Sequence, residues 1–483
     1  MRWGLLGMAV AGCAASASTP LSKVYGTTAD ECTGELGYYT SGVALTDLNG
    51  DGLSDLVLSN GNDMSPQPVV VFHHTGNPTN PYDNWPDWYS GDLGYHGGLA
   101  VGDIDGNGYP DVAVAVAFGL DRRPSGGVVQ VYFNHGGVLD AEPGFTTEGG
   151  KVALECALGD VDADGDLDLV VPRWSDPPTD DPIGQYHLPV PTPAEIYRND
   201  GGKLTATPAW TTASAVGAAS VAVADVDDDG WADVVLGGTS LDLHRGRKPT
   251  GTEIPIEASP SWTASTKFDL LFSLGVARRP GGVVVATSEA CLLSTSCVSG
   301  FSLYDPNRGK DPVWTSDPIP SASKLLLLDL NGDRVPDLAG GQWGASTAGG
   351  PVSLYQGTPG GSVIAPPTVI GDARVRESIA AGWLGASAAP TLTEIIRITD
   401  TRSVVTLPVG QAERVVSVSV TGPGAAASYA WCWWGNEVSI SPPMLPGQRV
   451  TIVYQASPVL GLAVGTWSPD MGTQIFASYL TAP

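Results

Sequence analysis

An aspartate-rich motif recurs along the chain and limits the possible folds more than any other feature. Copies begin at Asp47, Asp103, Asp160, Asp225 and Asp329, each within a strand–loop–strand pattern such as VALTDLNGDGLSDLVL. Neighbouring copies are about 55 to 65 residues apart, except for a double interval before Asp329. Repeats of about 50 residues are typical of β-propellers, in which each repeat forms one blade.

The double interval contains a unit without acids, LLFSLGVARRPGGVVVAT from Leu270, and another acid-free unit, IAAGWLGASAAPTLTEIIRI, starts at Ile379. Each unit also carries a strand that runs into a turn, such as VVQVYFNHGG, and most carry Pro-x-aromatic, as in Pro208-Ala209-Trp210. We interpret these aromatic residues as packing between neighbouring blades. Four short strands in each unit predict an all-β, seven-bladed β-propeller, and eight blades remain an alternative.

Composition agrees with this fold and excludes one class of partner. The chain has 62 Gly and 39 Pro among 483 residues, which favours many short strands joined by turns. Its formal net charge of -27 would repel the phosphates of a nucleic acid, so we expect no nucleic-acid partner.

Each nine-residue loop places oxygen-bearing side chains at positions 1, 3, 5 and 9, usually with Gly at position 6. Calcium takes about 6 to 8 oxygen ligands, and a tight loop with alternating acids can supply them, with a backbone carbonyl at position 7. The sequence therefore predicts four to five bound Ca²⁺ ions, the fifth loop being the exception with Arg334 at the glycine position. The predicted ligands are Asp47, Asn49, Asp51, the Leu53 carbonyl and Asp55; Asp103, Asp105, Asn107 and Asp111; Asp160, Asp162, Asp164 and Asp168; Asp225, Asp227, Asp229 and Asp233; and Asp329, Asn331, Asp333 and Asp337.

These repeats resemble those of the FG-GAP and VCBS class, seen in integrin α-subunit propellers and in many exported bacterial proteins, over residues 40 to 400. The resemblance implies that the Asp loop joins the first two strands of a blade and that partners bind the opposite face. Most units lack the literal Phe-Gly and Gly-Ala-Pro pairing, so the resemblance does not transfer an integrin ligand to this chain.

The two ends of the chain differ from the repeats. Residues 1–12 are interpreted as a signal peptide ending in a lipobox, with Cys13 as the lipidated N-terminus of an outer-membrane or cell-surface protein; cleavage to a secreted product is the alternative. We expect the propeller at residues 20–410, a small β-sandwich module at 411–456 and strands that return to the ring at 457–483. The segment PLSKVYGTT is a candidate closing strand.

Cys291 and Cys297 bracket a short loop and suit a disulfide, whereas Cys32, Cys156 and Cys432 cannot be paired from sequence. No hydrolase, zinc-protease or phosphate-loop motif is present, which favours a non-enzymatic protein. The expected function is binding or adhesion to a protein or glycan by a monomer attached to the membrane by lipid alone. A carbohydrate-active enzyme, such as a polysaccharide lyase or sugar dehydratase, or a lectin is the alternative.

Loops that join second and third strands should lie on the face opposite the calcium loops, and the longest of them spans residues 172–193. Long loops often carry function. The candidate ligand-binding residues on this face are Trp174, Tyr186 and His187 in that loop, Arg122 and Arg123 in the second unit, and Trp343 in the sixth.

Overall fold

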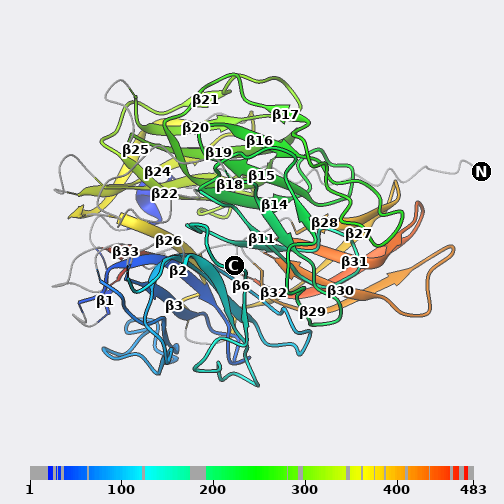
Figure 1. Cartoon of the computed structure of the whole chain (residues 1–483), viewed down its shortest axis with the longest axis horizontal. Coiled ribbons are helices and arrows are strands. Elements are labelled where there is room, and N and C mark those ends of the chain that lie inside the picture. Colours follow the sequence, from blue (N-terminus) through cyan, green and yellow to red (C-terminus); the bar gives the residue numbers. More distant parts are fainter. Residues whose placement is uncertain are drawn as a thin grey trace, which may run out of the picture.

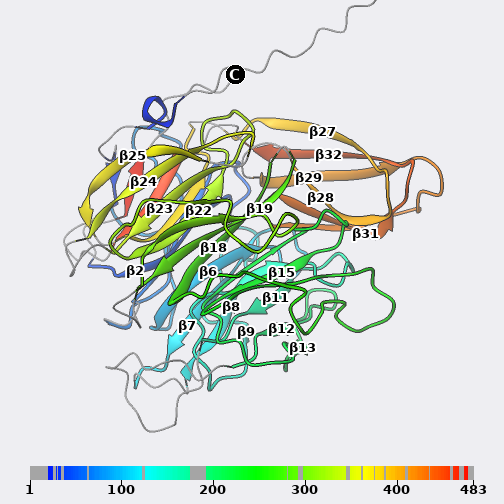
Figure 2. The same cartoon turned by 90° about the horizontal axis from the view of Figure 1, so that it is seen from above.

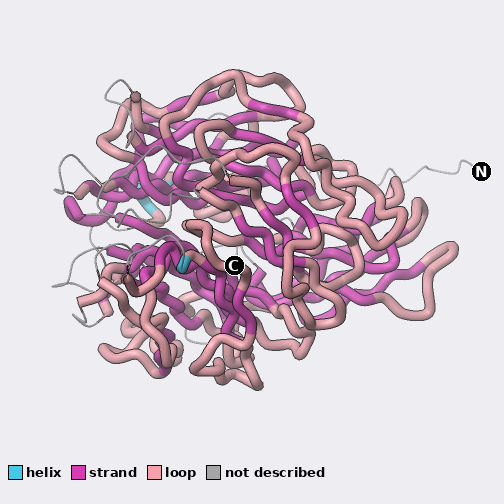
Figure 3. Tube along the Cα trace, viewed as in Figure 1, coloured by secondary structure: helices cyan, strands magenta, loops and turns pink. Residues whose placement is uncertain are grey.

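Among the residues that it describes, the computed structural model consists of β-strands joined by loops, with the short 3-10 helix η1 (Leu21–Lys23) and one further 3-10 residue at Gly126 (Figure 3). It describes residues 20–25, 29, 31–33, 37–61, 65–121, 126–174, 192–279, 281–291, 297–343, 349–360, 363–374, 376–385, 388–407, 412–434, 436–456, 461–466 and 473–476. Within these residues, no helix is long and apolar enough to cross a membrane.

The described strands form seven four-stranded antiparallel sheets, and six of these use four strands that are consecutive in sequence (Figure 1). The first three contain β2 (Thr40–Thr46), β3 (Asp55–Asn60), β4 (Val70–Phe72) and β5 (Trp88–Tyr89); β6 (Tyr95–Gly102), β7 (Asp111–Phe118), β8 (Val128–Tyr132) and β9 (Phe145–Thr146); and β10 (Ala157–Gly159), β11 (Asp168–Val171), β12 (Glu195–Tyr197) and β13 (Trp210–Thr211).

The next three sheets have the same order. They contain β14 (Ser220–Ala224), β15 (Asp233–Gly237), β16 (Leu241–His244) and β17 (Trp262–Thr263); β18 (Leu270–Arg279), β19 (Gly282–Ala290), β20 (Gly300–Tyr304) and β21 (Trp314–Thr315); and β22 (Ala322–Leu328), β23 (Asp337–Gln342), β24 (Gly350–Gly357) and β25 (Val363–Arg374). The acid-free unit from Leu270 thus forms a sheet like its neighbours.

The seventh sheet joins both ends of the chain. Its order is β26 (Arg376–Gly382), β33 (Gly461–Thr466), β34 (Gln474–Phe476) and β1 (Glu31–Cys32). The expected closing strand PLSKVYGTT differs from this, because Leu21–Lys23 is helical and β1 pairs with β34 instead. Leu21, Val24 and Tyr25 are buried against the apolar side chains of this sheet and its neighbour, which fixes the N-terminal segment there.

The first strands of the seven sheets lie next to one another in a closed cycle, which is the arrangement of a β-propeller. Contacts run from β2 to β6, β10, β14, β18, β22 and β26, and β26 again contacts β2. The repeated aromatic residues pack edge-on across sheet boundaries: Trp88 lies against Tyr132 with ring centroids 5.8 Å apart, and Trp314 against Tyr355 at 5.2 Å. Their interpretation as packing between neighbouring blades is confirmed.

Residues 391–456 form two three-stranded sheets with a shared apolar core, called the C-terminal module below (Figure 2). One sheet has the order β27 (Thr391–Arg397), β32 (Arg449–Ala456) and β29 (Ala412–Thr421), and the other has the order β28 (Arg402–Thr406), β31 (Glu437–Met444) and β30 (Ala430–Trp434).

The structure places the start of this module about twenty residues before the expected boundary at residue 410. The unit from Ile379 was expected to supply two ring strands, but only β26 lies in the ring, while β27 pairs with β32 along its length. Alternating apolar residues such as those of β27 suit either sheet, so the alternation could not assign the strand.

Candidate metal centres

The five Asp loops connect the first and second strands of five sheets and share one hydrogen-bonding pattern. In every loop, the carboxylate of the first Asp accepts hydrogen bonds from the N–H groups at positions 5 and 6. Asp47, for example, accepts from Asp51 at 3.1 Å and from Gly52 at 2.8 Å. The equivalent bonds are made by Asp103, Asp160, Asp225 and Asp329.

The ninth residue, also Asp, ties each loop to its own sheet. In the second loop, Asp111 accepts from Ile104 N–H at 2.8 Å and from Asn134 N–H, just after β8, at 2.7 Å. Asp55, Asp168, Asp233 and Asp337 make the same two bonds, to the loop and to the end of the third strand. Because backbone donors fix both carboxylates, each loop holds its oxygen atoms in a repeated geometry.

Each loop also needs two residues in the left-handed backbone region. At position 6, Gly108 has φ +92° and Arg334 has φ +66°. At position 4, Gly106 has φ +74°, Ala163 +61° and Asp228 +63°. The sequence analysis predicted the left-handed residue at position 6 but missed the one at position 4. Gly at position 4 of three loops is a signal that could have indicated it.

Carboxylates converge most closely in the second, third and fourth loops. Ligand atoms within 4.8 Å of one another come from Asp103, Asp105 and Asp111, from Asp160, Asp162 and Asp168, and from Asp225, Asp227 and Asp229. In the first and fifth loops Asn49 and Asn331 occupy position 3, so an amide replaces one of these carboxylates. A cluster of hard oxygen atoms held by a tight loop suits Ca²⁺.

Burial disfavours the ionised form of these carboxyl groups when no cation is bound. Burial raises the pKa of Asp111, Asp160 and Asp225 to about 7, and that of Asp233 to about 8. Burial followed by the neighbouring carboxylates raises the pKa of Asp164 to about 8. Packing buried acids together has a free-energy cost that a bound divalent cation would offset.

The C-terminal module lies directly against these loops. Ser439 Oγ donates to Asp160 Oδ2 at 2.6 Å, and Gly230 O accepts from the N–H groups of Ser403 and Val404 at 2.9 and 3.0 Å. Trp434 Nε1 donates to Val223 O on β14 at 3.0 Å. The module therefore contacts the loops at the residues that would surround metal ions, an arrangement that the sequence did not indicate.

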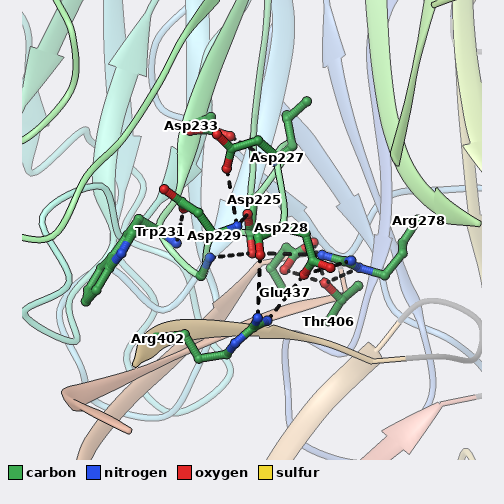
Figure 4. Close-up of polar contacts among 12 residues, drawn as sticks. Asp225, Asp227, Asp228, Asp229, Trp231, Asp233, Arg278, Arg402, Thr406 and Glu437 are labelled. Atoms are coloured by element: carbon green, nitrogen blue, oxygen red, sulfur yellow. Dashed lines mark hydrogen bonds and ion pairs between the residues drawn. The ribbon is translucent and has the colours of Figure 1, made fainter. Parts of the chain in front are cut away.

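Two arginines connect the fourth loop to its surroundings (Figure 4). Arg402 of the module lies 3.3 Å from Asp228 Oδ1, and Arg278 of β18 lies 3.0 Å from the same oxygen. Both guanidinium groups point toward the loop, with Thr406 and Glu437 between them. Asp228 at position 4 therefore connects the fourth loop to the C-terminal module through its ion pair with Arg402.

In sheet β18–β21, a buried ion pair lies at the end where the neighbouring sheets have an Asp loop. Arg279 Nη2 lies 2.7 Å from Asp305 Oδ2, and their side chains are 2% and 1% exposed. Arg308 contacts the same oxygen at 3.1 Å. Arginine side chains therefore lie at this end of the sheet, where its neighbours present carboxylates.

The structure describes two of the six candidate ligand-binding residues, Trp174 and Trp343. Trp174 is only 9% exposed and packs against Val152, Ala219 and Leu270, so it belongs to the core and not to an exposed aromatic platform. Trp343 is half-buried, and its Nε1 donates to Glu377 Oε2. Arg122, Arg123, Tyr186, His187 and Cys13 lie outside the described residues.

The structure describes the side chains of four cysteines. Cys291 and Cys297 form a disulfide with Cα atoms 5.5 Å apart. Cys156 and Cys432 are buried free thiols.

A comparison with known protein families identifies the same repeated units. Residues 47–114 and 190–236 match the family model of FG-GAP-like repeats. The chain is thus an all-β protein with FG-GAP-like repeats on a β-propeller fold.

No curated protein matches the chain. Among solved structures, the chain is similar to that of rhamnogalacturonan lyase YesW, with 18% sequence identity and a TM-score of 0.40. The match covers 73% of this chain and 61% of the lyase chain.

Proposed function

We propose that this protein is an exported, calcium-binding β-propeller that binds a protein or glycan at the cell surface and is not an enzyme. One observation carries the calcium proposal: five loops in separate sheets hold their first and ninth carboxylates with the same backbone hydrogen bonds. The coordinating oxygens would come from positions 1, 3, 5 and 9 of each loop, with the position 7 carbonyl. The bound cation would neutralise buried acids and cross-link the two strands that each loop joins.

The seven sheets would then be seven blades, the last one closed by strands from both chain ends, and the C-terminal module would be a small β-sandwich inserted within that blade. The module covers the calcium loops, and this supports binding of the partner on the opposite face. Four of the six candidate ligand residues on that face lie outside the described residues.

Export rests on residues 1–12 and attachment on Cys13. Labelled fatty acid should enter the wild-type protein but not the Cys13→Ser variant in a bacterial host. Equal labelling of both, or of neither, would contradict lipid attachment.

Partner binding is tested by probing protein and glycan arrays with the purified mature protein in millimolar calcium and in EDTA. The proposal predicts a defined set of ligands that is lost in EDTA, because calcium holds the ring and the module in place. Equal binding with and without calcium would contradict the proposal that partner binding depends on the metal loops.

A further inference from the structure

A cluster of charged and aromatic side chains occupies the end of the ring opposite the Asp loops. Lys324 lies near the start of β22, whose other end leads into the loop at Asp329. Glu377 and Phe272 lie at the equivalent ends of β26 and β18, and Trp343 directly follows β23. Glu155 precedes β10, so the cluster gathers residues from four sheets at the centre of one face.

Direct contacts connect these side chains. Lys324 Nζ donates to Glu155 Oε1, and Trp343 Nε1 donates to Glu377 Oε2. Lys324 Nζ also lies 4.8 Å from the centre of the Phe272 ring. The Phe272 and Trp343 rings meet edge to face with centroids 4.7 Å apart.

Burial distinguishes this cluster from an ordinary surface ion pair. Lys324 and Glu377 are 8% and 5% exposed, whereas Glu155, Phe272 and Trp343 are half-buried. Burial lowers the pKa of Lys324 to about 7. Buried ion pairs contribute little net stability, so stability alone is a weak reason for this arrangement.

The chemistry of the cluster favours one class of ligand. The ammonium group of Lys324 is already paired with Glu155, and the second carboxylate, Glu377, would repel an anionic ligand. Carboxylates accept hydrogen bonds from hydroxyl groups, an ammonium group donates them, and aromatic rings pack against the C–H faces of a sugar. A polyol with alternating hydroxyl and C–H surfaces satisfies all of these groups at once.

We infer that Lys324, Glu155, Glu377 and the Trp343–Phe272 pair form a binding site for a neutral sugar. This inference rests on the proposed binding function and specifies its ligand class and its place on the ring. Glu155 and Lys324 would contact hydroxyl groups, Trp343 would pack against a sugar ring, and Glu377 would position Trp343.

The test is calorimetric titration of the calcium-loaded protein with neutral cello-, xylo-, manno- and galacto-oligosaccharides. We expect at least one series to bind, and Glu155→Gln and Trp343→Ala each to weaken it about tenfold or more, as loss of a charged hydrogen bond or an aromatic contact does. Trp85→Ala is the matched control, because Trp85 is 69% exposed in the connection between β4 and β5, away from the cluster.

Failure of every series to bind, or unchanged binding by both variants, would overturn the sugar site. Lys324→Met serves as a second variant if Glu155→Gln lowers the melting temperature. Calcium content, measured on the same samples, separates this failure from failure of the proposed calcium function. Release of new reducing ends would support the site and overturn the non-catalytic function.

Discussion

The left-handed residues at position 4 of the loops allow a paired test of the loop geometry. Ala163 has φ +61° in the third loop, and Gly106 has φ +74° at the same position of the second loop. A Cβ added at Gly106 would meet nothing within 4 Å, so Gly106→Ala changes the backbone preference without a clash. The left-handed conformation costs an L-residue about 1–2 kcal/mol, and the greater freedom of Gly in the unfolded chain offsets about 0.4–1 kcal/mol of this.

We therefore expect Ala163→Gly to raise the free energy of unfolding by about 0.5–1 kcal/mol and Gly106→Ala to lower it by a similar amount. Urea unfolding in saturating calcium measures both changes, and the two loops act as controls for each other. Changes of the same sign in the two variants would refute the assigned loop conformation.

The other predictions concern the metal. Chelation with EDTA should lower the melting temperature strongly, since each site held at 100 times its Kd contributes about 2.7 kcal/mol, and salt should restore part of the loss; an unchanged melting curve would show the loops to be ordinary turns. The raised pKa values of Asp111, Asp160 and Asp225, about 7, mean that the metal-free folded protein binds extra protons, so its stability should fall as pH rises from about 4 to 8. Calcium affinity should show the opposite trend and rise over this range, because calcium requires the ionised carboxylates; parallel trends in melting and titration would contradict the assignment. Ser439→Ala should weaken one calcium site about tenfold or more by removing the hydroxyl that donates to Asp160, whereas the exposed Ser419→Ala should leave all sites unchanged in calorimetry.

The sequence predicted the repeat well because its signals are local. Alternating apolar strands on both sides of each Asp loop indicated the first two strands of a sheet, and the spacing of the acids indicated a turn around a cation. The acid-free unit from Leu270 was placed correctly for the same reason.

Contacts between distant segments could not be predicted in this way. The sequence did not indicate that Ser439 would reach Asp160, or that Lys324 would meet Glu155, because only closure of the ring and docking of the module bring these residues together. Trp174 was a ligand-binding candidate because it lies in the longest loop, but its side chain packs in the core with Val152 and Leu270. Position 4 was missed because Ala163 and Asp228 stand where the other three loops have Gly, and alanine adopts this backbone conformation only at a cost.

The number of calcium ions bound by the mature protein tests the central claim most directly. Metal analysis after equilibrium dialysis against millimolar calcium should give four to five ions per chain, with the loop that contains Arg334 accounting for the difference. Fewer than three ions per chain would contradict a calcium-binding propeller and leave the repeated carboxylate loops without the function proposed for them.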